Sequence, residues 1–127
     1  MSTILPWFLI AQAAMFPQLA PGSEVQVVSP DLVRVYAHGV LEGSVLTLEG
    51  ATLPAGGEVR VLVFPPDADA EESAAVMSGA RAVRGRMTAG GDGLWILPEG
   101  GGDATLLRDL LRAQGIELLL RVGENAP

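Results

Sequence analysis

The sequence has no cysteine and no lysine, and its one histidine is His38. The missing cysteine excludes disulfides, thiolate-bound metals and a cysteine nucleophile. The missing lysine excludes Schiff-base chemistry and the lysine of a phosphate-binding P-loop. A single histidine is too few for a metal site built from several imidazoles. We therefore expect a protein that folds without metal or cofactor and is not an enzyme.

Charged residues are also scarce and unbalanced. They make up 18% of the 127 residues, and 15 acids against 8 arginines give a formal net charge of −7. Tight binding to nucleic acid depends on basic side chains that neutralise phosphates, so the charge predicts no tight nucleic-acid binding. The length is that of one domain, and the 49% of hydrophobic residues is enough to form its core.

The N-terminus is apolar, with no charged side chain before Glu24. The run Ile4 to Phe16 has the length of a signal-peptide core, but no basic residue precedes it, and about 20 residues are needed to span a bilayer. We interpret residues 1–23 as an apolar arm or targeting segment plus a linker, ahead of one β-rich domain at 24–124. We expect a cytoplasmic protein; a secreted location, or membrane association through Ile4 to Phe16, is the close alternative.

Alternation of apolar and polar residues predicts six strands in two similar units. The first unit, about residues 32–64, has strands at 33–38, 45–48 and 58–64. The second unit, about residues 81–122, has strands at 81–87, 94–97 and 116–122. When the two units are aligned with Gly39 opposite Gly85, the inward-facing residues of the two hairpins fall at matching positions. This match favours a tandem repeat.

Two short helices are predicted between these strands. Asp69 and Glu72 have the spacing of an N-cap and its N3 partner, so a helix should cover 70–78. Asp103 can cap a second helix whose apolar face is formed by Leu106, Leu107, Leu110 and Leu111, and Gly115 suits its C-terminal end. The predicted fold is mainly β to α+β: a small barrel of about six strands, from two tandem hairpin-plus-strand units, with two short helices.

Residues 33–63 contain a strand followed by Tyr36-x-x-Gly39-Val40, Leu46-x-Leu48 and Leu53-Pro54-x-Gly56-x-x-Val59-x-Val61. This pattern resembles the swapped-hairpin, AbrB-like domain of bacterial antitoxins and transition-state regulators. The resemblance implies a barrel to which two chains each contribute a hairpin unit, with a basic face that can bind DNA. This chain differs from the family in its net charge and in continuing into a second β unit, which would let one polypeptide build the whole barrel.

The candidate site is a patch on the outward faces of two strands. Arg34, Tyr36 and His38 share one predicted face, and Arg84 and Arg86 share the equivalent face of the second unit. If these strands are neighbours, the five side chains form an anion-binding or partner-binding patch with aromatic support. The alternative is an ordinary solvated sheet face, which is the more common situation.

Other patterns lead to no catalytic or metal site. Asp67-x-Asp69-x-Glu71 is spaced like a calcium loop, but Glu72 stands where that loop needs glycine. Nothing in the sequence positions His38 with a serine and an acid. We therefore expect a non-enzymatic interaction or regulatory module that binds a protein partner or self-associates. The alternative is a secreted or envelope-associated bacterial β domain held by its N-terminal apolar segment.

Overall fold

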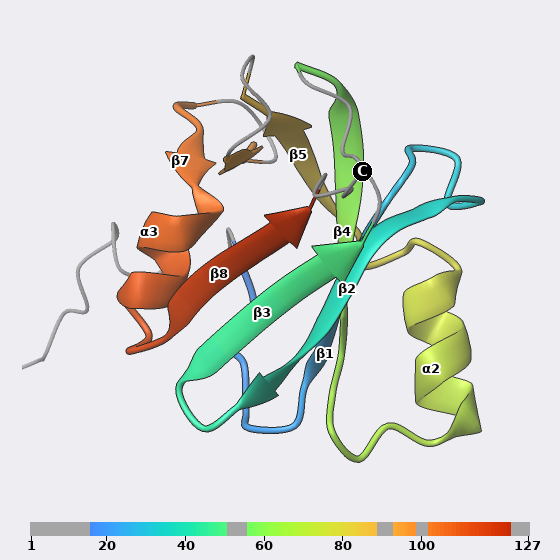
Figure 1. Cartoon of the computed structure of the whole chain (residues 1–127). Helices are drawn as coiled ribbons and strands as arrows, with labels where there is room; N and C mark the ends of the chain where they lie inside the picture. The colour runs from blue at the N-terminus through green and yellow to red at the C-terminus, as the bar shows by residue number, and fades with distance from the viewer. Residues whose placement is uncertain (1–15, 51–55, 89–92, 99–101, 123–127) are drawn as a thin grey trace, which may run out of the picture.

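The computed structural model describes residues 16–50, 56–88, 93–98 and 102–122, in which eight strands form one sheet (Figure 1). The strands are β1 (Glu24–Val28), β2 (Val35–Glu42), β3 (Val45–Gly50), β4 (Glu58–Phe64), β5 (Val83–Met87), β6 (Leu94–Ile96), β7 (Thr105–Leu106) and β8 (Glu117–Val122). Their order across the sheet is β7-β6-β5-β4-β1-β2-β3-β8. Neighbouring strands are antiparallel, except that β8 runs parallel to β3.

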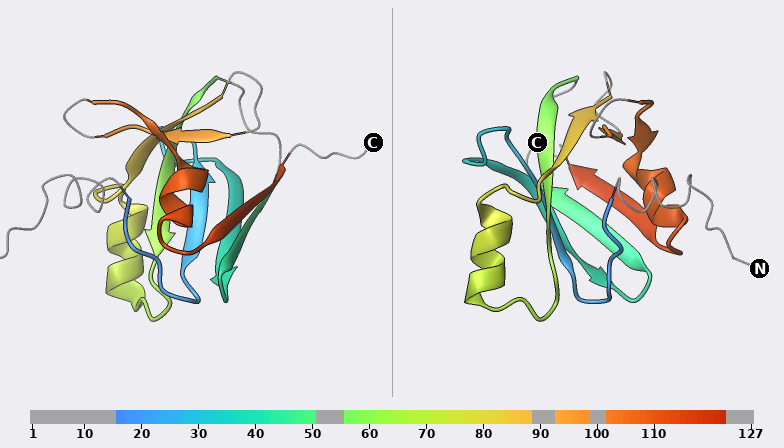
Figure 2. Two further views of the ribbon diagram at one scale, coloured as in Figure 1. Left: turned by 90° about the vertical axis from the view of Figure 1, so that its left-hand side faces the viewer. Right: turned by 180° about the vertical axis from the view of Figure 1, so that it is seen from behind.

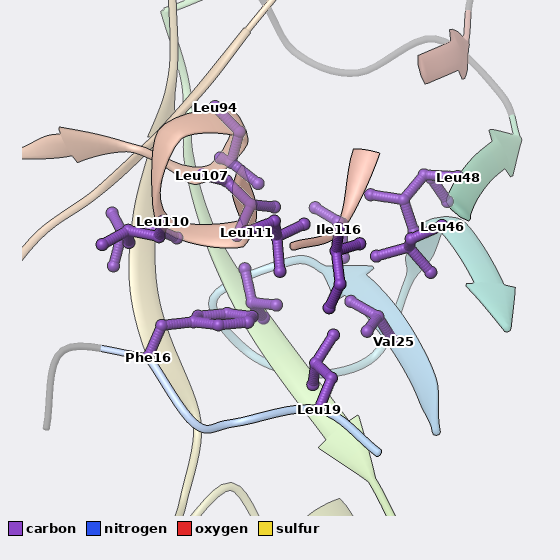
Figure 3. Packing of buried hydrophobic residues seen from close by; sticks show 14 of the residues in the cluster. Phe16, Leu19, Val25, Leu46, Leu48, Leu94, Leu107, Leu110, Leu111 and Ile116 are labelled. Atoms are coloured by element: carbon purple, nitrogen blue, oxygen red, sulfur yellow. The ribbon is translucent and has the colours of Figure 1, made fainter. Parts of the chain in front are cut away.

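The sheet curls around helix α3 (Leu107–Arg112), whereas helix α2 (Ala70–Met77) lies outside the curl (Figures 1 and 2). Because side chains alternate between the two faces of a strand, every second residue points into the concave side. There the strands and α3 form the main hydrophobic cluster, which includes Val25, Leu46, Leu48, Leu107, Leu111 and Ile116 (Figure 3). A smaller cluster on the convex side contains Val28, Leu62 and Val76, the last of which belongs to α2.

Strands β2 and β3 approach each other closely at Gly39. A Cβ atom at Gly39 would lie 1.9 Å from the carbonyl oxygen of Thr47, which is shorter than any non-bonded contact. Only glycine therefore fits where these two strands meet.

The β-rich α+β class and the two short helices are confirmed, but the closed barrel of about six strands is wrong. No strand is predicted at 24–28, yet β1 forms there and lies between β4 and β2. The sheet also stays open, because β7 and β8 are its two ends and do not pair with each other.

The two predicted units are not arranged equivalently. Both hairpins form, as β2–β3 and β5–β6. The third strand of the first unit, β4, pairs with β1 and β5, whereas the third strand of the second unit, β8, pairs in parallel with β3. The two units therefore share the same alternation of hydrophobic residues, but their third strands have different neighbours.

The first helix begins as predicted and the second does not. The carboxylate of Asp69 accepts a hydrogen bond of 2.8 Å from the backbone N–H of Glu72, which confirms the cap of α2. Helix α3 begins at Leu107 without a side-chain cap from Asp103, because Thr105 and Leu106 pair with β6 as strand β7. Leu107, Leu110 and Leu111 are buried as expected.

The core extends further toward the N-terminus than the predicted arm and linker at 1–23 imply. Phe16 and Leu19 are buried in the main cluster (Figure 3). The Leu19 N–H donates to Gln114 Oε1 at 2.9 Å, and Gln114 Nε2 donates to the Pro17 carbonyl at 3.1 Å. These two hydrogen bonds connect residues 17–19 to Gln114, in the turn that follows α3. Residues 1–15, with nearly all of the apolar run, lie outside the described residues.

Candidate functional site

The structure separates the two halves of the predicted patch. Strand β2 holds Tyr36 and His38, strand β5 holds Arg84 and Arg86, and strands β1 and β4 lie between them. Adjacent strands are about 4.8 Å apart, so these three steps put roughly 14 Å between β2 and β5. The condition under which the five side chains would form one patch is therefore not met, because β4 and β1 separate the two strands.

The residues at the start of β2 also differ from one another. Arg34 and His38 are exposed, as predicted. The pairing of β1 with β2 shifts between Val27 and Val28, which leaves Tyr36 without an opposite residue in a β-bulge. A bulge interrupts the alternation of faces. Tyr36 is accordingly half-buried against the main cluster instead of standing on an open face beside His38.

On β5, Arg84 and Arg86 acquire a neighbour that the sequence analysis missed. Arg60 of β4 lies opposite Arg84, and both guanidinium groups approach Glu58 Oε2, at 3.0 Å from Arg60 and 3.8 Å from Arg84. Arg86 lies opposite Trp95 of β6. Two arginines thus contact one glutamate on the convex face, and Arg86 stands opposite the same glutamate in the pairing of β4 with β5. Arg60 alternates with Val59 and Val61, so its outward face could have been predicted, but its neighbours could not.

The loop between β1 and β2 holds Arg34 in place through polar contacts. The Ser29 hydroxyl donates to Asp31 Oδ1 at 2.5 Å and accepts from the Arg34 N–H at 3.0 Å. The Ser29 hydroxyl and, next, the Val33 N–H lower the pKa of the Asp31 carboxyl from its usual 3.8. Ser29 is therefore engaged in the loop and does not pair with His38.

The open end of the sheet at β8 presents free backbone groups. The Glu117 N–H donates to the Ser44 carbonyl at 2.8 Å, so Glu117 and every second residue after it face β3. The N–H and C=O groups of Leu118 and Leu120 consequently point the other way. Among the described residues, no strand pairs with β8 on that side.

A cleft of about 360 Å³, lined by four leucines and a tryptophan together with Thr88, Gly93 and Arg108, lies beside this edge. One wall is formed by Leu118 and Leu120 of β8, and the other comes from β6, β7 and the start of α3, with Leu94, Trp95, Leu106 and Arg108. Leu118 and Leu120 pack against the main cluster and are only partly buried. The cleft is the gap left where the curled sheet does not close.

The edge itself carries few of the features that normally prevent edge-to-edge association. Such features include proline, charged side chains, bulges and very short strands, and of these β8 has only the charges of Glu117 and Arg121. Strand β8 is six residues long, reads ELLLRV, and has an outward-facing Leu119 that is 38% exposed. We therefore take the free edge of β8 together with the adjoining cleft, called the β8 seam below, as the candidate functional site.

Comparisons with known proteins add no relative: no family model, curated protein or solved structure matches this chain. In the part of the chain that the structure describes, no helix is long and apolar enough to cross a membrane. No group of three histidine, aspartate or glutamate residues gathers within metal-binding reach in those same residues.

Proposed function

We propose that this chain is a non-enzymatic protein-binding module that adds an extended strand of a protein partner to the β8 seam. The observation that supports this most directly is the orientation of Leu118 and Leu120, whose N–H and C=O groups face the open side of the sheet. Within the described residues these four backbone groups have no partner strand, and such a row is a template for one more strand.

The cleft supports the same mode of binding. A strand placed beside β8 turns every second side chain toward the concave face. Those side chains would enter the space bordered by Leu94, Leu106 and Leu120. Backbone hydrogen bonds would then supply affinity, and the cleft would select apolar side chains at alternate positions.

The experiment is selection of random peptides from a displayed library on the full chain, followed by amide hydrogen exchange of β8 with each selected peptide. We expect the peptides to slow exchange at Leu118 and Leu120. Leu120→Pro removes one edge-facing donor without touching the ladder to β3, and Leu106→Glu alters the opposite wall of the cleft. Both variants should lose the peptides while retaining the cooperative thermal transition of the wild type.

Arg34→Glu is the matched control, because Arg34 is exposed and is not among the residues that line the cleft. It should bind the peptides as the wild type does. Selected peptides that leave exchange at Leu118 and Leu120 unchanged, or a library that yields no peptide bound at β8 of the monomeric chain, would contradict the proposal.

A further inference from the structure

We infer that the strand added at the β8 seam is β8 of a second copy of this chain, running antiparallel about a two-fold axis at Leu119. This inference rests on the proposed function and names its partner. The result would be a symmetric dimer in which the two curled sheets continue into each other through their β8 edges.

The backbone restricts which registers are possible. Leu118 and Leu120 face the free edge, and Glu117, Leu119 and Arg121 face β3. In an antiparallel pair, edge-facing residues must stand opposite edge-facing residues to exchange hydrogen bonds. A symmetric pair can therefore be centred on Leu118, Leu119 or Leu120, but not between two residues.

The charges select one of these three registers. Centring on Leu119 places Glu117 of each copy opposite Arg121 of the other, so two opposite-charge pairs form. Centring on Leu118 or on Leu120 puts Leu119 opposite one of the charged residues and forms no such pair. Neither Glu117 nor Arg121 forms an ion pair among the described residues; on β3, Val45 stands opposite Glu117 and Glu49 stands opposite Arg121.

The same register also matches the apolar residues. The two Leu119 side chains, each 38% exposed on the convex face, would cover each other at the axis. Leu118 of one copy would stand opposite Leu120 of the other as a hydrogen-bonded pair, on the side of the cleft. The segment Glu117–Arg121 is thus self-complementary when reversed, which is what a two-fold interface requires and what an unrelated partner would not require.

The test uses charge reversal in the full chain, with the association state measured by sedimentation over a range of concentrations. Glu117→Arg places two arginines opposite each other at both ends of the pair, and Arg121→Glu places two glutamates there. Each single variant should weaken dimerisation by about tenfold or more. The double variant should restore it, because its homodimer again pairs opposite charges.

A mixture of the two single variants gives the sharpest result. One copy then carries arginine at both positions and the other carries glutamate at both, so the mixed dimer should form although neither variant dimerises well alone. Glu71→Arg and Arg34→Glu change the net charge equally at exposed positions away from β8 and should leave dimerisation unchanged.

Three outcomes would overturn the inference, and they separate it from the proposed function. If the wild-type chain is a monomer and its β8 binds the library peptides, the inference that a second copy supplies the strand is refuted, but the proposed function is not. A dimer that is insensitive to both reversals refutes this register. If the chain is a monomer and the amides of Leu118 and Leu120 are protected from exchange at every concentration, the chain covers its own edge. This result refutes both proposals.

Discussion

The two edges of this sheet end in different ways. Strand β7 has only two residues and passes directly into α3, whose Leu107 and Leu111 are fully buried. Strand β8 has six residues, no covering strand among the described residues, and an exposed leucine at its centre. A short edge that turns into a core helix offers little template for another chain, whereas a long apolar edge offers a complete one.

The difference follows from where each edge places its hydrophobic residues. After β7 the chain coils, so its leucines enter the concave side as one helix face and fill it. In β8 the extended backbone sends Leu118 and Leu120 inward but leaves Leu119 outside. Three consecutive leucines cannot all be buried by a strand with one covered face. The exposed leucine is therefore a consequence of the strand geometry.

The largest expected effect tests the structural side of this comparison. Leu111→Ala, in the helix that follows β7, should lower the free energy of unfolding by about 2–5 kcal/mol, because it empties a fully buried site. Leu119→Ala, on β8, should change it by no more than about 0.5 kcal/mol in dilute protein. Urea denaturation of both variants measures the contrast, and equal losses would show that β8 is as buried as α3.

Much of this contrast could be predicted from the sequence. The apolar faces of 58–64, 94–97 and 116–122 identify strands β4, β6 and β8, and Asp69 with Glu72 identifies the start of α2. These elements depend on residues close together in the chain, where periodicity and capping act. The sequence predicts helix at Thr105 and Leu106, whose strand character depends on pairing with the distant β6.

The candidate site depended on long-range order and was therefore harder to predict. Whether Arg34 and Arg84 are neighbours depends on β1, a five-residue strand that lies between β4 and β2. The free edge of β8 exists only because β8 pairs with β3 on one side and with no described strand on the other. Local pattern establishes that a strand exists but not which strand lies beside it.

A smaller effect compares the edge with the centre of the sheet. In dilute monomer, the amides of Leu119 and Arg121 should exchange slowly, because they face β3, and those of Leu118 and Leu120 should exchange faster. Strand β1 has β2 on one side and β4 on the other, so Val25 and Gln26 should show no such alternation. Hydrogen exchange resolved by residue measures both strands in one experiment. Uniform protection along β8 would mean that the edge is covered.

The smallest effect concerns the β1–β2 loop, which joins two central strands and serves as a reference away from both edges. Because its hydrogen bonds from Ser29 and Val33 stabilise the ionised carboxylate, Asp31 has a lower pKa in the folded chain than its usual 3.8. The ionised Asp31 carboxylate therefore contributes its full stabilisation above about pH 3.8. This stabilisation is lost as the pH falls through the pKa that Asp31 has in the folded chain. Asp31→Asn cannot be protonated in this range, so on acidification the wild type should lose slightly more thermal stability than the variant. Melting curves recorded on both sides of pH 3.8 test this, and parallel pH profiles for the two proteins would show that the loop contacts contribute nothing.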